Sequence, residues 1–163
     1  ISSKLGVGTT VTLSLPLKIA KEAAPETNAP MGKNAHQMLR ILLAEDNELN
    51  REIAEFMLQD AGMDVTAVQD GQQAVSTFMD HPEGTFDVIL MDIMMPVMDG
   101  IEAAKAIRAS DRKDAQAIPI FAMTANAFDE DCRKTLAAGM NEHFTKPLDM
   151  QKLIAAIQRD CNL

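Results

Sequence analysis

Several side chains that could bind a cation or a phosphate group stand directly after short apolar runs of the chain. They are Glu45 and Asp46 after residues 39–44, Asp92 after 86–91, Thr124 after 118–123, and Lys146 after 143–145. If the apolar runs are parallel strands of one sheet, their carboxyl ends lie along one edge, where ligands of such sheets bind. The spacing therefore predicts that three carboxylates, one hydroxyl and one amine converge in a common pocket.

The predicted pocket has the composition of a magnesium site that handles phosphate. Carboxylate oxygens suit Mg²⁺, and Mn²⁺ accepts the same ligands. Without a cation, three neighbouring carboxylates would repel one another and take up protons. An aspartate can act as a nucleophile and form an acyl phosphate. Phosphoryl transfer depends mainly on positioning and on charge neutralisation, which the metal ion, Lys146 and Thr124 would supply together.

Each of these residues also has a simpler interpretation. A single aspartate after a strand, such as Asp92, is often a turn or capping residue. The Glu45–Asp46 pair could cap a helix that begins near Asn47. Thr124 could be a cap, and Lys146 could be a solvated surface charge. The coincidence of four such sites after four separate strands favours the common pocket.

The pocket requires a scaffold, and five apolar runs alternate with helical patterns from residue 39 onward. The runs cover residues 39–44, 65–68, 86–91, 118–123 and 143–145. Near-continuous apolar strands separated by amphipathic helices are typical of a parallel sheet covered on both faces. Right-handed crossovers favour a doubly wound arrangement. The predicted fold class is α/β, a doubly wound five-stranded parallel sheet with helices on both faces.

The helical patterns are apolar residues at spacings of three and four. They are Leu49, Ile53, Met57 and Leu58; Ala74, Val75, Phe78 and Met79; Ile101, Ala104 and Ile107; Phe128, Cys132 and Leu136; and Leu153, Ile154, Ile157 and Cys161. Gly62 and Gly139 follow the first and the fourth pattern, as expected at helix ends. Asp149 is predicted to cap the last helix.

Composition narrows the function classes. The net charge is −9; residues 1–38 carry about +2 and the rest about −11, an acidic body that should repel nucleic acid. No apolar run approaches the roughly 20 residues that span a bilayer, and no signal-peptide pattern is present. We therefore expect no direct membrane contact. Two cysteines are too few for a disulfide scaffold, which favours the cytoplasm.

The first 38 residues differ in character from the rest. Val11, Leu13, Leu15 and Leu17 alternate with polar residues and proline, which predicts a half-buried strand within residues 1–17. Residues 18–38 are small, polar and proline-containing, and are predicted to be a flexible linker. The chain begins with Ile1 rather than methionine, so we interpret it as a piece of a longer protein.

Four motifs identify the remainder as similar to a known family. They are residues 41–47 (ILLAEDN), 91–100 (MDIMMPVMDG), 123–127 (MTANA) and 144–147 (FTKP). In this order and with these gaps, residues 39–163 resemble the two-component receiver domain over their full length. The resemblance implies a flavodoxin-like sheet with strand order 2-1-3-4-5.

The resemblance also implies roles for individual residues. Asp92 would be the phosphoacceptor. Glu45, Asp46, Asp92 and the main-chain carbonyl of Met94 would hold Mg²⁺. Catalysis would further involve Thr124 as the switch hydroxyl and Lys146 as a contact of the phosphoryl oxygens.

Two features near the end of the domain complete this comparison. The family has a cis peptide bond before the proline, so Lys146–Pro147 is a candidate for one. Three residues before the lysine, the family commonly has a Tyr or Phe that moves with the switch hydroxyl. His143 stands there instead, which brings the coupling to Thr124 into question. A histidine could add pH dependence, or could be a partly exposed ring without such a role.

The flanks favour a hybrid sensor histidine kinase as the parent protein. Residues 5–17 resemble the closing strand of a histidine-kinase ATPase domain, although a leader of other origin is the alternative. A response-regulator transcription factor would usually continue into a helix-turn-helix, and the chain stops after its last helical pattern. This piece is too short to bind ATP, so it would catalyse only its own phosphorylation and dephosphorylation.

The leading hypothesis is a phosphorelay. Asp92 would receive a phosphoryl group from the dimerisation-domain histidine of the same or a sister chain and pass it to a histidine phosphotransfer protein. Family likeness places that partner near residues 50–58. The alternative is a regulatory module that inhibits its own kinase through protein contacts. A small-molecule phosphatase ranks last, because Met94 stands where such enzymes need a second aspartate.

Overall fold

The computed structural model describes residues 2–4, 8–10, 38–125 and 129–161. The chain divides into two compact units, residues 1–35 and 36–163. In the first unit, β1 (Ser2–Lys4) pairs antiparallel with β2 (Gly8–Thr10). The strand predicted from Val11 to Leu17 lies outside the described residues, as does nearly all of the predicted linker.

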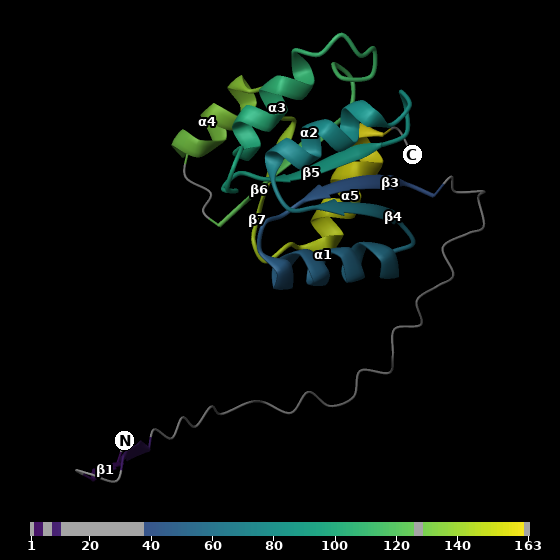
Figure 1. Ribbon diagram of the computed structural model, residues 1–163. Helices are drawn as coiled ribbons and strands as arrows, with labels where there is room; N and C mark the ends of the chain where they lie inside the picture. The colour runs from purple at the N-terminus through teal and green to yellow at the C-terminus, as the bar shows by residue number, and fades with distance from the viewer. Residues whose placement is uncertain (1, 5–7, 11–37, 126–128, 162–163) are drawn as a thin grey trace. The chain divides into compact units, whose positions relative to one another are not determined.

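The second unit is built on a five-stranded parallel sheet (Figure 1). Its strands are β3 (Arg40–Ala44), β4 (Asp64–Val68), β5 (Val88–Asp92), β6 (Ile120–Thr124) and β7 (Glu142–Thr145). Their order in the sheet is β4-β3-β5-β6-β7. Numbered within this unit, that order is 2-1-3-4-5, so the predicted fold class and strand order are confirmed.

Four helices join these strands, a fifth follows β7, and helices cover both faces of the sheet (Figure 1). They are α1 (Glu48–Asp60), α2 (Gly71–Asp80), α3 (Gly100–Arg108), α4 (Asp129–Ala137) and α5 (Met150–Asp160). Leu42 and Ala44 of β3 pack on one face with buried residues of α2 and α3. Ile41 and Leu43 pack on the other face with α1 and α5. Successive residues of β3 thus enter opposite cores, which is why the run is continuously apolar.

Aspartate and asparagine caps fix where four of the helices begin. Asn47, Asp70, Asp99 and Asp149 cap α1, α2, α3 and α5, and each accepts a hydrogen bond from the main-chain N–H three residues later. Such a bond satisfies one of the free donors of the first turn. The predicted capping role of Asp149 is confirmed.

The buried faces of two helices differ from the apolar patterns in the sequence. Leu49 and Ile53 of α1 are 63% and 50% exposed, whereas Leu58 of the same predicted pattern is buried, together with Ala54, which the pattern did not include. Because α1 carries two apolar lines at helical spacing, the pattern locates the helix without showing which line faces inward. In α4, Leu136 is also exposed. Its predicted companions Phe128 and Cys132 lie outside the described side chains.

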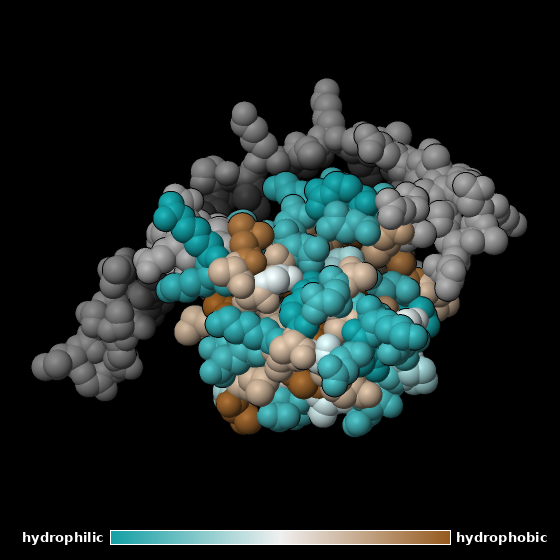
Figure 2. All heavy atoms as spheres, turned by 90° about the horizontal axis from the view of Figure 1, so that it is seen from above, coloured by the Kyte–Doolittle hydropathy of each residue, from teal (hydrophilic) through white to brown (hydrophobic). Residues whose placement is uncertain are grey.

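No helix in the part of the chain that the structure describes has the length and apolar character needed to cross a membrane. Viewed from above Figure 1, hydrophobic side chains appear as separate spots among hydrophilic ones rather than as one continuous patch (Figure 2).

Candidate functional site

The sheet brings the predicted functional residues to one edge. Asp92 and Thr124 are the last residues of β5 and β6. Glu45 directly follows β3, and Lys146 directly follows β7, whose Thr145 is in register with Thr124. The register of parallel strands therefore places these residues at corresponding heights.

Three carboxylates form a cluster at this edge. Glu45, Asp46 and Asp92 each offer an oxygen atom, and these atoms lie within 4.8 Å of one another. Asp46 is exposed, whereas Glu45 and Asp92 are only 3% and 5% exposed. Two buried carboxylates beside a third need a positive charge nearby.

Lys146 supplies that charge. Its Nζ lies 2.5 Å from Oδ2 of Asp92 and also forms an ion pair with Oε2 of Glu45. The other oxygen of Asp92, Oδ1, accepts a hydrogen bond of 3.1 Å from the main-chain N–H of Met94. The side chain of Lys146 is only 21% exposed, so it is not a freely solvated surface charge.

Burial and charge shift the ionisation of this pair. Burial raises the pKa of Asp92 above its ordinary value, and the hydrogen bond and charge of Lys146 oppose that shift only in part. For Lys146, burial alone would lower the pKa, but hydrogen bonds and charges from Asp92 and Glu45 outweigh it and raise the pKa. The ammonium group therefore stays charged. A cation beside Asp92 would favour its ionised form.

Helix α1 begins beside the acidic loop and contacts it directly. Asn47 caps the helix, so Glu45 and Asp46 are not its capping residues. In the first turn, Nδ2 of Asn50 donates to Oε1 of Glu45 at 3.1 Å, and Arg51 donates to the main-chain carbonyls of Glu45 and Asp46. The sequence analysis did not single out Asn50 or Arg51 for these roles. The one feature of the sequence that could have pointed to these two residues is their position, about one helical turn after the acidic pair.

Two glycines hold the loop between β5 and α3 against the site. The N–H of Gly100 donates to the carbonyl of Ile93 at 2.9 Å, and a Cβ atom at Gly100 would lie 2.0 Å from the carbonyl oxygen of Asp92. The N–H of Gly71 donates to the carbonyl of Met98 at 3.1 Å. A Cβ atom at Gly71 would lie 2.5 Å from that oxygen. Backbone approaches as close as these require glycine.

The remaining predicted residues have these positions. Thr124 is buried at the end of β6, and its carbonyl accepts a hydrogen bond from the N–H of Lys146 at 2.8 Å. Met94 is 81% exposed. The Lys146–Pro147 peptide bond is cis, the form that the resemblance implies. His143 is half-buried in β7 and borders a hollow of about 610 Å³ between β7 and α5.

The carboxylate cluster fits a magnesium ion. Hard oxygen donors from two or three carboxylates, with the rest of the shell left to water, match the usual coordination of Mg²⁺. Among the described residues, this is the one group of three or more His, Cys, Asp or Glu side chains close enough to share a metal ion. Glu45, Asp46 and Asp92 are therefore the residues that could hold a metal.

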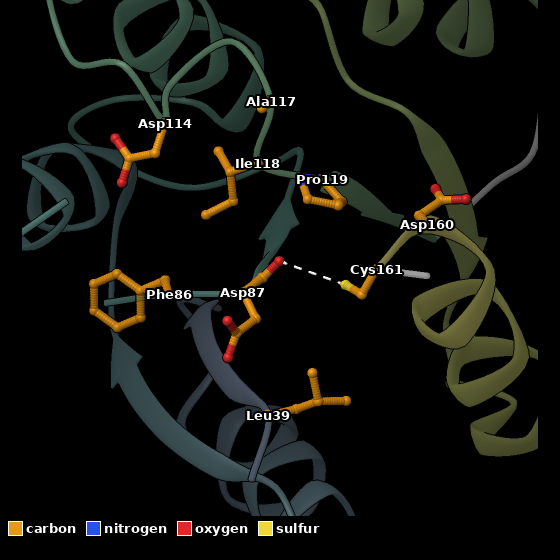
Figure 3. A pocket seen from close by; sticks show the side chains of 9 residues that line it. All are labelled: Leu39, Phe86, Asp87, Asp114, Ala117, Ile118, Pro119, Asp160 and Cys161. Atoms are coloured by element: carbon orange, nitrogen blue, oxygen red, sulfur yellow. Dashed lines mark hydrogen bonds between the residues drawn. The ribbon is translucent and has the colours of Figure 1, made fainter. Parts of the chain in front are cut away.

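A hollow of about 350 Å³ lies at the opposite end of the sheet (Figure 3). Its carboxylates are engaged elsewhere, because Asp87 pairs with Arg40 and Asp114 pairs with Arg112. The thiol of Cys161 lies 3.7 Å from the carbonyl oxygen of Asp87, and burial raises the pKa of this thiol. A protonated thiol is a poor nucleophile, so Cys161 is not a candidate nucleophile in this hollow.

Comparison with known proteins agrees with this geometry. The sequence model of the response regulator receiver domain family matches residues 41–158. The autoinducer 2 sensor kinase/phosphatase LuxQ of Vibrio vulnificus (strain YJ016) is 36% identical over 157 residues, which cover 94% of this chain and 17% of LuxQ. The chain spans between 7% and 17% of the length of several such curated relatives.

Solved structures show the same likeness. The receiver domain of sensor histidine kinase PA1611 from Pseudomonas aeruginosa PAO1, solved with a magnesium ion in its active-site cleft, is 40% identical with a TM-score of 0.69. The match covers 77% of this chain and 99% of that one. The Saccharomyces cerevisiae Ssk1 receiver domain, solved with the histidine phosphotransfer protein Ypd1, gives 31% identity and a TM-score of 0.65, over 74% and 87% of the two chains.

The matched residues cover the parallel sheet from the second residue of β3 onward and include all three carboxylates of the acidic cluster. The sheet order is that of the receiver fold. This chain therefore belongs to the family of response regulator receiver domains.

Proposed function

We propose that this domain accepts a phosphoryl group on Asp92 in a magnesium-dependent reaction. The observation that carries the proposal is the contact of the Lys146 ammonium with Oδ2 of Asp92, inside a cluster of three carboxylates. A carboxylate oxygen of Asp92 would attack phosphorus as the P–N bond to a phosphohistidine breaks. The bond pair would leave with the imidazole, which ends neutral after gaining a proton.

The residues around Asp92 would act by positioning and by charge. Lys146 already contacts the nucleophile and would donate hydrogen bonds to the phosphoryl oxygens, as would the Thr124 hydroxyl. The Met94 N–H bond to Oδ1 would hold the Asp92 carboxylate in place. Bound Mg²⁺, held by Glu45, Asp46, Asp92 and the Met94 carbonyl, would neutralise charge on the transferred group; Mn²⁺ would serve as a substitute.

A direct test is phosphorylation of the purified chain by acetyl phosphate with Mg²⁺, followed by intact-mass measurement. The wild-type protein should gain the mass of one phosphoryl group, and Asp92→Asn should gain none. Asp80→Asn, which alters an exposed aspartate at the end of α2, is the matched control and should be modified like the wild type. An unmodified wild-type protein, under conditions that phosphorylate another receiver domain, would overturn the proposal.

We also propose that the parent protein is a hybrid sensor histidine kinase of the cytoplasm or with a cytoplasmic catalytic part. The likeness to LuxQ covers 94% of the chain and so extends beyond the receiver domain into the first 38 residues. This supports residues 1–17 as the end of a kinase ATPase domain and residues 18–38 as a linker. The phosphoryl donor would be the dimerisation-domain histidine of the same or a sister chain.

The proposed acceptor is a histidine phosphotransfer protein that docks on α1. Leu49, Ile53 and Phe56 form an exposed line, the α1 apolar stripe, with exposures of 63%, 50% and 70%. A hollow of about 180 Å³ lies between α1 and residues 146–148 and includes Ile53, Glu45 and Lys146 in its lining. The stripe thus continues to the phosphorylation site. Such a surface suits an apolar helical partner that presents a histidine.

Charge reversal of the stripe tests this docking surface. Phe56→Asp should slow phosphoryl transfer to a histidine phosphotransfer protein by about tenfold or more, because a buried interface cannot take an unpaired charge. Phosphorylation by acetyl phosphate should stay unchanged. Leu136→Asp, at an exposed leucine of α4, is the control. Equal transfer rates for both variants would show that the partner docks elsewhere.

The competing proposal is a module that inhibits its own kinase through protein contacts alone. The buried carboxylates around Lys146 argue against it, because a module that acts through protein contacts alone needs no such group of charges at the strand ends. Kinase output that is the same with wild-type domain and with Asp92→Asn would favour this alternative.

A further inference from the structure

The first turn of α1 holds the acidic loop through hydrogen bonds from two of its side chains, Asn50 and Arg51. Nδ2 of Asn50 donates to Oε1 of Glu45 at 3.1 Å. The guanidinium group of Arg51 donates to the carbonyl of Glu45 at 3.0 Å and reaches that of Asp46 at 3.4 Å. Asn47 caps this same turn, so the turn itself is fixed in place.

The contact of Asn50 matters because of how Glu45 is buried. Glu45 is 3% exposed, and its two oxygens are divided between Asn50 and Lys146. Lys146 also contacts Asp92, so its ammonium is shared between two carboxylates. If Lys146 turned toward a phosphoryl group on Asp92, Asn50 would remain as a partner of Glu45. A buried carboxylate without a partner carries a large desolvation penalty.

The contact of Arg51 acts on the main chain. Its NH1 group engages the carbonyls of two successive residues, Glu45 and Asp46, so both peptide groups point toward α1. The side chains of these residues are then left to the cluster they form with Asp92. A guanidinium group can hold two acceptors at once because its donors are fixed in one plane.

We propose that Asn50 and Arg51 are positioning residues of the phosphorylation site, with Asn50 fixing the Glu45 carboxylate and Arg51 fixing the Glu45–Asp46 main chain for Mg²⁺. This inference rests on the proposed magnesium-dependent phosphorylation of Asp92. The competing explanation is that both contacts merely stabilise the start of α1. The two explanations differ in one respect, because only a positioning role changes the affinity for the metal.

The decisive measurement is titration calorimetry of the unphosphorylated chain with Mg²⁺. Asn50→Leu keeps the size of the side chain and removes its donor, and it should weaken Mg²⁺ binding about tenfold, the usual effect of losing a partner of a metal ligand. Arg51→Met should weaken it by a few-fold, about three. Gln59→Leu removes a similar bond on the same helix, from Nε2 of Gln59 to Glu55 at 3.2 Å, and should leave the affinity unchanged.

A second readout separates metal positioning from chemistry. In Asn50→Leu, the Mg²⁺ concentration needed for half-maximal phosphorylation by acetyl phosphate should rise about tenfold, while the rate at saturating Mg²⁺ stays close to that of the wild type. Thermal unfolding in EDTA checks that each variant folds. If Asn50→Leu does not fold, Asn50→Ser, which is too short to reach Glu45, replaces it and should give the same result.

The outcomes are distinguishable. Wild-type affinity for Mg²⁺ in Asn50→Leu and Arg51→Met, together with phosphorylation of wild-type Asp92, would overturn the positioning role and leave the proposed function intact. A wild-type chain that is not phosphorylated on Asp92 would instead overturn the proposed function.

Discussion

Lys146 stands where two buried carboxylates meet, and its ammonium pairs with both Glu45 and Asp92. A divalent cation would be drawn to the same carboxylates. The lysine and the metal would therefore compete for negative charge before the proposed phosphorylation, although both would later neutralise the phosphoryl oxygens. Removal of the Lys146 ammonium should therefore have opposite effects on the affinity for Mg²⁺ and on the rate of phosphorylation.

We expect Lys146→Met to bind Mg²⁺ about three- to tenfold more tightly, because a competing positive charge is lost from a half-buried site. The same variant should be phosphorylated about 100-fold more slowly, because the ammonium no longer stabilises the transferred group. Titration calorimetry and the rate of acetyl phosphate labelling measure the two effects. Lys152→Met, at a side chain 77% exposed, should change neither. Weaker Mg²⁺ binding in Lys146→Met would refute the competition.

The sequence predicted the grouping of Glu45, Asp92 and Lys146 because strand ends in a parallel sheet meet at one edge. It did not predict Asn50 or Arg51, because amides and guanidinium groups occupy the exposed face of almost any helix. Asp99 shows the converse difficulty. It lies close to Asp92 in the sequence and serves as the cap of α3. An aspartate can be a nucleophile or a helix cap. In this stretch of sequence, only its position at the end of a strand distinguishes Asp92 from the capping Asp99.

At the scale of elements, the start of α3 is packed directly on the end of β5. A Cβ atom at Gly100 would approach the carbonyl oxygen of Asp92 to 2.0 Å and the side chain of Met91 to 2.9 Å. The hydrogen bond from the Gly100 N–H to Ile93 requires this close approach. The helix therefore braces the strand that carries the proposed phosphoacceptor.

Gly100→Ala should lower the free energy of unfolding by about 3 kcal/mol, because the added methyl group meets backbone that cannot move aside. Gly84→Ala is the control. Gly84 has a φ of +74° with open space around its Cβ position, so only the backbone conformation is penalised, by about 1 kcal/mol. Urea unfolding followed by circular dichroism suits a chain without tryptophan. Equal losses in both variants would mean that α3 can shift away from Asp92.

Helices could be located from the sequence more readily than their buried faces could. The spacing of Leu49, Ile53 and Leu58 predicted α1 correctly, yet of these three only Leu58 is buried, beside Ala54. A small alanine is buried there because the helix lies close to the sheet, which depends on contacts distant in the sequence. Leu49 and Ile53 belong instead to the exposed α1 apolar stripe. The apolar spacing in the sequence therefore marks both residues of the core and residues of an exposed surface.

At the scale of the whole molecule, the domain is acidic and gathers three of its carboxylates at one point. A cation that binds to this cluster in the folded protein, and not in the unfolded protein, stabilises the fold by mass action. Binding and stability are thus linked, and stability can report the site without any phosphoryl donor.

We expect Mg²⁺ at 100 times its Kd to stabilise the domain by about 2.7 kcal/mol and to raise Tm by about 10 °C. Asp46→Asn and Glu45→Gln should shrink this increase, because each removes a charge from the cluster. Asp80→Asn should not, since Asp80 lies at the end of α2, outside the cluster. Differential scanning calorimetry with and without Mg²⁺ measures the shift. An identical increase in all four proteins would place the metal elsewhere.

The two glycine contacts that hold the β5–α3 loop also leave part of that loop free of packing constraints. Gly71 and Gly100 secure the loop through backbone atoms near its far end. Between Asp92 and these anchors, Met94 and Val97 are more than four-fifths exposed. The side chains at those two positions face solvent and do not pack against Asp92. Substitutions there would therefore alter the surface beside the proposed phosphoacceptor and leave the scaffold as it is.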